Sequence, residues 1–306
     1  MIPYGRQDIS QADIDAVAKV LRSDFLTQGP MVPRFEAAVS QYCGVGHAVA
    51  VNSATSALHI ACLALDLGPG DWLWTSPNTF VASANCALYC GAKVDFVDID
   101  PRTYNLCPQK LEEKLVQAEK AGKLPKIVVP VHFAGQPCDM QAIYDLSQKF
   151  GFKIIEDASH AIGASYESGR DGATKHVKVG SCVHSDITVF SFHPVKIITS
   201  AEGGLATTND EALAKRMQHL RTHGITTESS LMQPRPDDEI WNYQQIELGF
   251  NYRMTDMQAA LGASQLSRLD GFVSRRHQIA AVYDRAFDEL SVIAPWQLPG
   301  TRSSYH

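Results

Sequence analysis

The chain has 306 residues, of which 45% are hydrophobic and 20% charged, and 27 Lys and Arg against 33 Asp and Glu give a formal net charge of -6. These proportions are typical of a folded soluble protein and exclude a disordered or fibrous one. Because the chain lacks the basic excess that drives binding to a phosphate backbone, we expect no nucleic-acid partner. Its length favours one large domain with a smaller one beside it.

Seven cysteines are scattered through the sequence, without a CxxC pair or the Cys and His spacing of a metal site. This usage favours a reducing compartment and predicts no bound metal. The first residues do not form a basic and apolar leader, and no apolar stretch approaches the roughly 20 residues that span a bilayer. We therefore expect a cytoplasmic protein without a membrane partner.

Two helices are predicted before the first strand. Apolar residues from 14 to 21 recur at helical spacing, and Ser10 with Asp13 resembles a capping box in which Asp replaces Glu. The second helix is expected over about residues 33–44, with Pro33 near its start and Gly44 past its end. The chain therefore opens with a helical segment.

The centre of the sequence alternates short apolar segments with amphipathic ones. The short segments predict strands at residues 47–51, 72–75, 94–97, 127–131 and 153–156. The amphipathic segments predict helices at residues 56–67, 79–89, 108–121 and 140–150. Short apolar strands between helices indicate an α/β fold with a mostly parallel sheet covered on both faces.

The last part of the chain departs from this alternation. In order, it predicts a loop or hairpin at 163–185, strands at 188–192 and 205–208, a mobile insertion at 228–238, and helices at 255–269 and 271–290. The two helices lead towards a smaller domain.

Several common signatures are absent from the sequence, namely a P-loop, a GxGxxG between a strand and a helix, HExxH and GxSxG. Kinase, nicotinamide-dehydrogenase, zinc-protease and serine-hydrolase functions therefore lack their usual support. The predicted sheet must serve another chemistry.

The first predicted strand ends in Asn-Ser-Ala-Thr-Ser (52–56), where small hydroxylated residues lead into a helix. Free N–H groups at a helix start can hold a phosphate, and Thr55 and Ser56 would add hydroxyl donors. Ordinary capping of the helix by Ser or Thr explains the same residues. Both interpretations stay open on this segment alone.

The segment Lys-Ile-Ile-Glu-Asp-Ala-Ser-His (153–160) predicts a buried strand that ends in two acids and a histidine. Open α/β sheets bind their ligands at this end of the strands. Asp157 could pair there with a protonated heteroaromatic nitrogen, or it could form a structural ion pair or helix cap. His160 taken alone favours a hydrogen-bonded structural role.

Lys196 follows the apolar strand expected at 188–192. A lone lysine is usually a solvated surface charge, but this one is reached through a buried strand and could be desolvated enough to act as an amine nucleophile. Together with Asp157 and the helix start at the 52–56 segment, Lys196 completes the minimum apparatus for pyridoxal phosphate: a Schiff-base lysine, a partner for the ring nitrogen and a phosphate cradle.

Six short segments carry a more specific resemblance. They are Ser-Asp-Phe-Leu-Thr-Gln-Gly-Pro (23–30), Asn-Ser-Ala-Thr-Ser-Ala-Leu (52–58), Glu-Asp-Ala-Ser-His-Ala-Ile-Gly (156–163), Ser-Phe-His-Pro-Val-Lys (191–196), Glu-Gly-Gly (202–204) and Asn-Tyr-Arg-Met (251–254). In order and spacing they resemble the sugar aminotransferases of the DegT/DnrJ/EryC1/StrS family, which have the aspartate-aminotransferase fold (fold type I). The resemblance runs from Pro3 to the last residues.

This resemblance implies a domain organisation. Residues 1–250 would form the large pyridoxal-phosphate-binding domain with its N-terminal helical segment, and residues 251–306 the start of a smaller C-terminal domain. Family members continue beyond the position of His306, so we expect this second domain to be incomplete. The active unit would be a homodimer with shared active sites.

The resemblance also assigns roles to single residues. Lys196 would hold the cofactor as a Schiff base and act in catalysis together with Asp157, the partner of the pyridine nitrogen. The residues implied in cofactor binding are Ala54, Thr55, Phe80, Asp157, His160, Ser191, Lys196 and, reaching the neighbouring subunit's phosphate, Asn251. The residues implied in substrate binding are Tyr4, Asp24, Phe25, Leu26 and Thr27.

Within the family, Pro-Tyr-Gly-Arg-Gln (3–7) and the 52–56 segment most resemble the aminotransferases of pseudaminic acid biosynthesis. These use glutamate to aminate a UDP-linked 4-keto-6-deoxy-N-acetylhexosamine, so we expect formation of UDP-4-amino-4,6-dideoxy-N-acetyl-beta-L-altrosamine. Another nucleotide-linked keto-sugar, such as the GDP-perosamine type, is an alternative. Arg6, Arg221 and Arg253 are unranked candidates for binding the glutamate carboxylate.

Two further functions remain as rivals on the same fold. Relatives that dehydrate sugars carry histidine where this chain has Lys196, so the lysine favours transamination over dehydration. A non-catalytic regulator would need no cofactor, and its purified form would lack a cofactor absorbance band.

Overall fold

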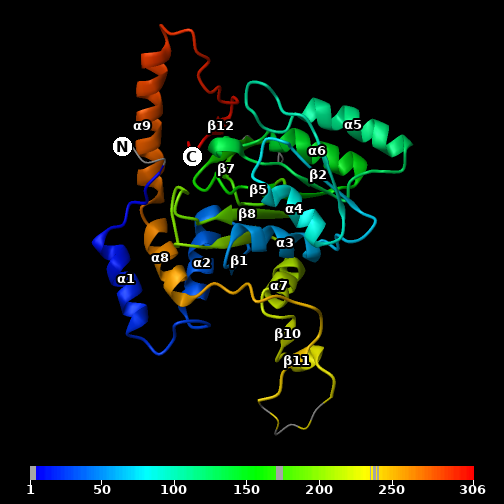
Figure 1. The fold of residues 1–306 in the computed structure, drawn as a ribbon, viewed down its shortest axis with the longest axis vertical. Coiled ribbons are helices and arrows are strands. Elements are labelled where there is room, and N and C mark those ends of the chain that lie inside the picture. The colour runs from blue at the N-terminus through cyan, green and yellow to red at the C-terminus, as the bar shows by residue number, and fades with distance from the viewer. Residues whose placement is uncertain (1–4, 170–174, 235, 237–238, 240) are drawn as a thin grey trace.

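A seven-stranded sheet forms the centre of the molecule in the computed structural model, which describes residues 5–169, 175–234, 236, 239 and 241–306 (Figure 1). In spatial order the strands are β1 (His47–Val51), β9 (Gly204–Thr208), β8 (Ile187–Ser191), β5 (Lys153–Asp157), β4 (Ile127–Val129), β2 (Trp72–Thr75) and β3 (Lys93–Phe96). β9 runs antiparallel to both of its neighbours, and the other adjacent pairs are parallel. The predicted α/β fold with a mostly parallel sheet is confirmed.

Two hydrophobic cores hold helices against the two faces of this sheet. One core contains residues of α2 (Met31–Cys43), α5 (Pro108–Lys120) and α6 (Met140–Phe150). The other contains residues of α3 (Ala54–Ala64), α4 (Ala82–Tyr89) and α7 (Glu211–Leu220). Successive residues of β5 point into different cores: Ile154 belongs to the first core and Ile155 to the second. Burial on both faces explains why the strands read as continuous apolar runs.

The N-terminal helix α1 (Gln11–Leu21) packs against α8 (Asp256–Leu266). The predicted capping box is present: Ser10 Oγ accepts a hydrogen bond from the Asp13 backbone, and the Asp13 carboxylate accepts one from the Ser10 backbone. Asp13 is fully buried and also pairs with Arg268 at 2.6 Å. One carboxylate therefore caps α1 and ties it to the end of α8.

Two smaller sheets accompany the central one. β12 (Thr301–Arg302), β6 (Ser165–Ser168) and β7 (Lys175–Lys178) form an antiparallel sheet, so the segment predicted as a loop or hairpin is a hairpin. β10 (Ile225–Thr226) pairs with β11 (Gln244–Gln245). Two short 3-10 helices complete the elements, η1 (Phe133–Gly135) and η2 (Ser229–Leu231). The insertion predicted at 228–238 lies partly outside the described residues, at 235, 237 and 238.

Some element boundaries differ from the predicted ones. α2 begins two residues early, at Met31, and α4 begins at Ala82 rather than at residue 79, after a turn in which Ser83 N–H donates to Phe80 O. α7 was not predicted, although Asp210 caps it by accepting hydrogen bonds from two backbone amides. Its buried residues form a narrow stripe of one residue per turn, which is a weak periodic signal.

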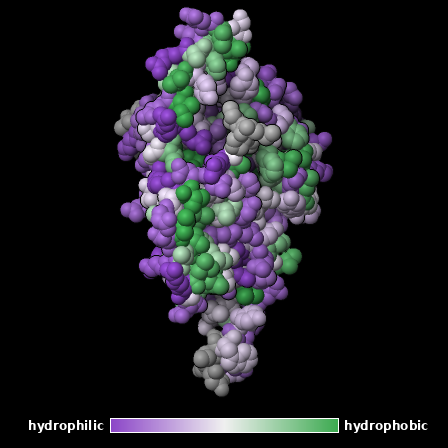
Figure 2. Space-filling model, turned by 60° about the vertical axis from the view of Figure 1, so that its left-hand side comes forward, coloured by the Kyte–Doolittle hydropathy of each residue, from purple (hydrophilic) through white to green (hydrophobic). Residues whose placement is uncertain are grey.

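The long helix α9 (Leu269–Phe287) runs along one side of the molecule (Figure 1). Figure 2 brings α1, α8 and α9 forward and shows hydrophobic side chains gathered among hydrophilic ones on this side. α9 buries Leu269 and Val273, while Val282 and Tyr283 are more than half exposed. In the described part of the chain, no helix has the length and apolar character to cross a membrane. A domain boundary at residue 250 stays a prediction.

Candidate active site

A cavity of about 650 Å³ lies where β5 and β8 end and α3 begins. Its lining includes seven of the residues that the sequence singled out, which are Ala54, Thr55, Phe80, Asp157, His160, Ser191 and Lys196. They come from segments that are far apart in the sequence. Parallel strands carry their carboxyl ends to one edge of the sheet, and this topology assembles the cavity.

One corner of the cavity is formed by the start of α3. Ser53 is the N-cap, and its Oγ accepts a hydrogen bond of 3.1 Å from Ser56 N–H. The amides of Ala54 and Thr55 belong to the first turn, whose N–H groups have no partner within the helix. Gly204 of β9 lets this turn approach the sheet, because a Cβ there would lie 2.3 Å from the Ser53 carbonyl carbon. The N-capping of the simpler interpretation is therefore present, and the free amides of the same turn stay available to an anion.

Asp157, the last residue of β5, extends from the floor of the cavity and is 5% exposed. Its Oδ2 accepts a hydrogen bond of 2.6 Å from Ser83 Oγ, and its Oδ1 accepts one of 3.1 Å from Ser159 N–H. Among the described residues, no Lys, Arg or His forms an ion pair with this carboxylate. A buried carboxylate that lacks a counter-ion and borders a cavity is suited to a cationic ligand atom.

Ser83 is a site residue that sequence reasoning missed. It is fully buried near the start of α4, and its hydroxyl is also 2.7 Å from Thr79 Oγ1. The available signal was a lone hydroxyl in an otherwise small and apolar helix turn, which by itself does not point to an aspartate elsewhere in the chain.

Lys196 lies in the turn after β8 and is half-buried, with its backbone N–H bonded to His193 O. Burial lowers the pKa of Lys196, and the charge of Asp157 opposes part of this shift. A lowered pKa increases the share of neutral amine, which is the nucleophilic and basic form. The predicted desolvation of this lysine is therefore present.

His160 lines the cavity as well as being hydrogen-bonded. Its ring stacks on His306, with centroids 4.0 Å apart, and its Nδ1 accepts a bond of 3.3 Å from Ala134 N–H. Burial, helped by the charge of Lys196, lowers the pKa of His160 to about 4. The ring is therefore neutral at pH 7.

A second cavity, of about 670 Å³, shares four lining residues with the first, namely Phe133, Ala134, Lys196 and His306. Its wall carries Arg6, Arg102, Arg275 and Arg276 together with the aromatic side chains of Tyr104, Tyr283, Trp296 and Tyr305. The Arg102 guanidinium lies 4.5 Å from the ring centroid of Trp296. Lys196 thus borders both the cavity at the start of α3 and this second cavity, which is lined by arginine and aromatic side chains.

The three arginine candidates for binding the glutamate carboxylate differ in where their side chains lie. Arg6 lines the second cavity, which Lys196 also borders. Arg221 donates to Glu36 and to Ala50 O, so its guanidinium is already engaged. Neither Arg221 nor Arg253 borders either cavity.

Other predicted residues lie away from the cavities within this chain. Asp24, Phe25, Leu26 and Thr27 form an exposed segment, and Thr27 makes a bridge to Thr255. Asn251 is exposed and bridges to Thr222. None of these residues borders either cavity, and Tyr4 lies outside the described residues. Their implied roles stay predictions.

The residues present fit pyridoxal phosphate. The first turn of α3 and Ser191 offer amides and a hydroxyl for the phosphate, the unpaired carboxylate of Asp157 suits the ring nitrogen, and Lys196 supplies a desolvated amine. Phe80 borders the same cavity and is 73% exposed, which leaves its ring face free.

Comparisons with known proteins agree with this chemistry. Residues 7–306 match the DegT/DnrJ/EryC1/StrS aminotransferase family. The chain is 42% identical over 289 residues to the UDP-4-amino-4,6-dideoxy-N-acetyl-beta-L-altrosamine transaminase of Campylobacter jejuni subsp. jejuni serotype O:23/36 (strain 81-176), covering 94% of this chain and 70% of that protein.

Solved structures are similar over nearly the whole chain. PseC from Helicobacter pylori, an aminotransferase involved in the biosynthesis of pseudoaminic acid, gives a TM-score of 0.85 at 31% identity and covers 99% of this chain and 76% of its own. The PLP form of the sugar aminotransferase Spr1654 from Streptococcus pneumoniae gives 0.82 at 29% identity, covering 100% and 76%. The predicted family, cofactor and reaction class are confirmed. The chain belongs to the DegT/DnrJ/EryC1/StrS aminotransferase family and is accordingly a pyridoxal-phosphate-dependent aminotransferase of the kind that acts on nucleotide-linked sugars.

Proposed function

We propose that this enzyme transfers the amino group of glutamate to the 4-keto carbon of a UDP-linked 4-keto-6-deoxy-N-acetylhexosamine, forming UDP-4-amino-4,6-dideoxy-N-acetyl-beta-L-altrosamine. One observation supports this reaction most directly: the half-buried amine of Lys196 and the Asp157 carboxylate, which has no ion-pair partner among the described residues, line the same cavity. The identity to the Campylobacter transaminase supports the choice of sugar and nucleotide.

Lys196 would act twice in each half of the reaction. Pyridoxal phosphate, when bound, supplies a carbonyl carbon that takes up the amine and a ring that accepts electrons. The Nζ of Lys196 would hold the cofactor covalently and would be freed when the amino donor takes its place. The free amine would then take the proton from Cα of glutamate and, in the second half of the reaction, give a proton to C4 of the sugar, so that the proton gained is balanced by the proton returned. Burial favours this role because it lowers the pKa of the amine.

The other cavity residues would hold the cofactor in place. The Ala54 and Thr55 amides and the Ser191 hydroxyl would bind the phosphate, and Phe80 would stack on the ring. Asp157 would keep the ring nitrogen protonated, with its carboxylate oriented by Ser83 and by the Ser159 amide. His160, neutral and near Lys196, would also contact the cofactor, and the Ala134 amide holds its ring in place.

The second cavity would receive the two substrates in turn. Both glutamate and a UDP-sugar are anionic, and the arginines on this wall would attract them. Arg6 is the strongest of the three candidates for the glutamate carboxylate, because it borders the chamber next to Lys196 and makes no ion pair with a described residue. Tyr4 and residues 24–27 are proposed to contact the sugar nucleotide.

A homodimer with shared sites is part of this proposal. Asn251 is exposed and does not border its own chain's cavities, which is what a residue serving a partner's phosphate requires. Mixing Lys196→Ala and Asn251→Ala chains tests the arrangement. If Asn251 acts across the interface, each mixed dimer contains one intact site and activity returns. If Asn251 acts within its own chain, mixing restores nothing.

The substrate is tested by offering the purified enzyme UDP-linked and GDP-linked 4-keto sugars with glutamate and identifying the product by mass spectrometry and NMR. We expect amination at C4 of the UDP-linked N-acetylhexosamine. Amination of the GDP-linked sugar alone would replace this substrate with one of the GDP-perosamine type.

We also place the enzyme in the cytoplasm, where its seven free cysteines would stay reduced.

A further inference from the structure

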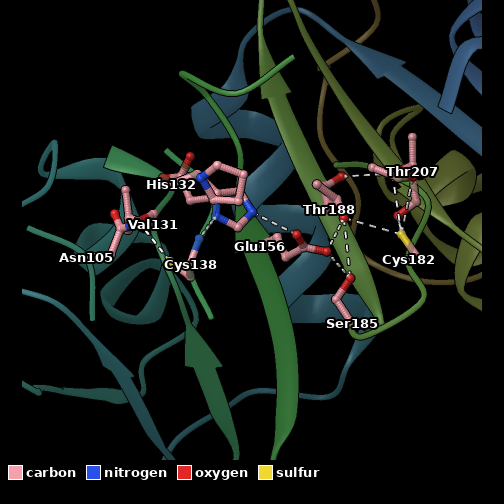
Figure 3. A network of polar contacts seen from close by, with 12 residues as sticks. Asn105, Val131, His132, Cys138, Glu156, Cys182, Ser185, Thr188 and Thr207 are labelled. Carbon is pink, nitrogen blue, oxygen red and sulfur yellow. Dashed lines mark hydrogen bonds and ion pairs between the residues drawn. The ribbon is translucent and has the colours of Figure 1, made fainter. Parts of the chain in front are cut away.

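The chain between β4 and η1 forms one wall of the cofactor cavity, and a buried histidine on the side away from the cavity fixes its position. Val131, Phe133 and Ala134 border the cavity, whereas His132 does not. Its imidazole is fully buried and points to the side chain of Glu156 (Figure 3). The proposed reaction uses neither His132 nor Glu156, so their buried polar contacts call for another explanation.

The hydrogen bonds fix the proton of His132 on one nitrogen. Nδ1 accepts a bond of 3.0 Å from Cys138 N–H, which leaves Nε2 to carry the proton that faces Glu156. Nε2 then donates to Glu156 Oε2 at 2.7 Å. The ring therefore links the turn before α6 to the end of β5.

Glu156 is in turn held by β8 and the turn that precedes it. Its Oε1 accepts hydrogen bonds from Ser185 Oγ and, at 2.8 Å, from Thr188 Oγ1 (Figure 3). Burial raises the pKa of Glu156, but the bonds from His132, Ser185 and Thr188 outweigh burial and the net shift is downward. The carboxylate is thus charged and held by three donors, which fixes its position.

The same histidine also binds the neighbouring catalytic residue through the main chain. His132 N–H donates to Asp157 O at 3.1 Å, and Asp157 N–H donates to Pro130 O at 2.9 Å. Because side chains alternate along a strand, Glu156 faces the network while Asp157 faces the cavity. His132 therefore forms two hydrogen bonds to β5: its side chain bonds Glu156, and its backbone bonds Asp157.

We propose that His132 is a positioning residue that, through Glu156, sets where the Asp157 carboxylate and the 131–134 wall meet the cofactor ring. This inference rests on the proposed function, in which Asp157 holds the ring nitrogen protonated. Without the side-chain bond, the end of β5 would be joined to the segment after β4 only by the backbone bonds of residue 157 to Pro130 and His132, and the carboxylate would shift relative to the nitrogen it serves. Small displacements of this kind cost much of an electrostatic contact.

The test compares His132→Asn with His132→Gln in the cofactor-loaded enzyme. Asn can accept from Cys138 N–H but is too short to reach Glu156, whereas the Gln amide nitrogen can occupy the place of Nε2 and donate to Glu156. The readout is the pH midpoint at which the visible absorbance of the lysine-linked cofactor changes. A ring nitrogen that loses its proton no longer repels a proton on the lysine-linked nitrogen, so this midpoint rises.

We expect the midpoint of His132→Asn to rise in the direction of Asp157→Asn, with kcat falling on the order of tenfold or more and KM for glutamate changing less. His132→Gln should restore the wild-type midpoint. Thr188→Val removes a different donor to Glu156 and should move the midpoint in the same direction. This second variant provides the test if His132→Asn does not fold. A folded His132→Asn or Thr188→Val enzyme with the wild-type midpoint would overturn the inference.

Glu156→Gln separates position from charge. A rotated amide can accept from His132 and donate to the Ser185 and Thr188 hydroxyls, so every bond is kept while the charge is lost. We expect a wild-type midpoint; a shift as large as that of Asp157→Asn would mean that Glu156 acts through its charge, against the inference. If the wild-type enzyme itself shows no cofactor band, the proposed function fails first, and the two failures are distinguishable.

Discussion

Ser83 and Asp157, 74 residues apart in the sequence, are joined by a hydrogen bond of 2.6 Å from the Ser83 hydroxyl to Oδ2 of the carboxylate. Both side chains are buried, and of the two only Asp157 borders the cofactor cavity. The bond fixes the plane of the carboxylate, and the Ser159 amide holds its other oxygen. The helix α4 therefore takes part in orienting a residue of β5.

Ser83→Ala is expected to bind cofactor and to slow turnover on the order of tenfold, because one hydrogen bond to the carboxylate is lost and its orientation loosens. The measurement is the single-turnover rate with glutamate. Ser147→Ala is the matched control, since Ser147 is a buried helical serine whose hydroxyl bonds Tyr144 O away from the cavities. Equal rates in the two variants would argue against an orienting role for Ser83.

Asp157→Asn is expected to keep part of its cofactor and to slow glutamate deamination on the order of a hundredfold or more, because an amide does not stabilise the charge on the ring nitrogen. The half-reaction is followed by the change in cofactor absorbance. Asp139→Asn is the control: Asp139 caps α6 by accepting from Ala142 N–H, which an amide oxygen can also do. Near-normal rates in Asp157→Asn would refute its assignment.

Lys196→Ala should lose both the visible band of the lysine-linked cofactor and all turnover, because no other group can supply the amine at this position. Lys196→Arg should fail in the same way, since a guanidinium stays protonated. Lys149→Ala, at an exposed lysine paired with Glu112, serves as the control for loss of a positive charge. An active Lys196→Ala enzyme with an unchanged spectrum would sink the assignment.

Gly204→Ala should weaken cofactor binding and reduce the free energy of unfolding by about 1–3 kcal/mol, because the added Cβ would meet the backbone of Ser53 and Ala54. Cofactor affinity by fluorescence titration and thermal unfolding are the measurements. Gly68→Ala adds a Cβ into open space and should change neither quantity appreciably. The idea fails if the two alanine variants bind cofactor equally well.

The acid stability of the cofactor-free protein should depend on His160. Its pKa is lowered to about 4, so between the ordinary value of 6.5 and about 4 the unfolded chain binds more protons than the folded one. Stability therefore falls as the pH drops through this window. His160→Gln, whose amide oxygen can still accept from Ala134 N–H, should lose less Tm between pH 6.5 and 4.5 than the wild type. Identical Tm profiles would contradict this expectation.

The local pattern of the sequence was sufficient to predict the fold class and to indicate that Thr55, Asp157 and Lys196 lie around one cavity. The alternation of apolar strands with amphipathic helices indicates a parallel sheet, and the carboxyl ends of parallel strands meet at one edge. Asp157 and Lys196 follow two such strands, and Thr55 opens the helix after a third. Their approach to one another could therefore be inferred before any contact was known.

The contacts between distant segments were decided by the tertiary structure alone. Nothing local to α4 indicates that Ser83 meets Asp157, and nothing local to Arg221 indicates that Glu36 engages its guanidinium while Arg6 borders a cavity. Hydrophobic periodicity encodes which face of an element is buried, but the side chain that faces it depends on strand order and helix packing across the whole chain. For this reason the sequence determined the chemistry of the site, and only the packing of the sheet and its helices decided which polar groups orient it.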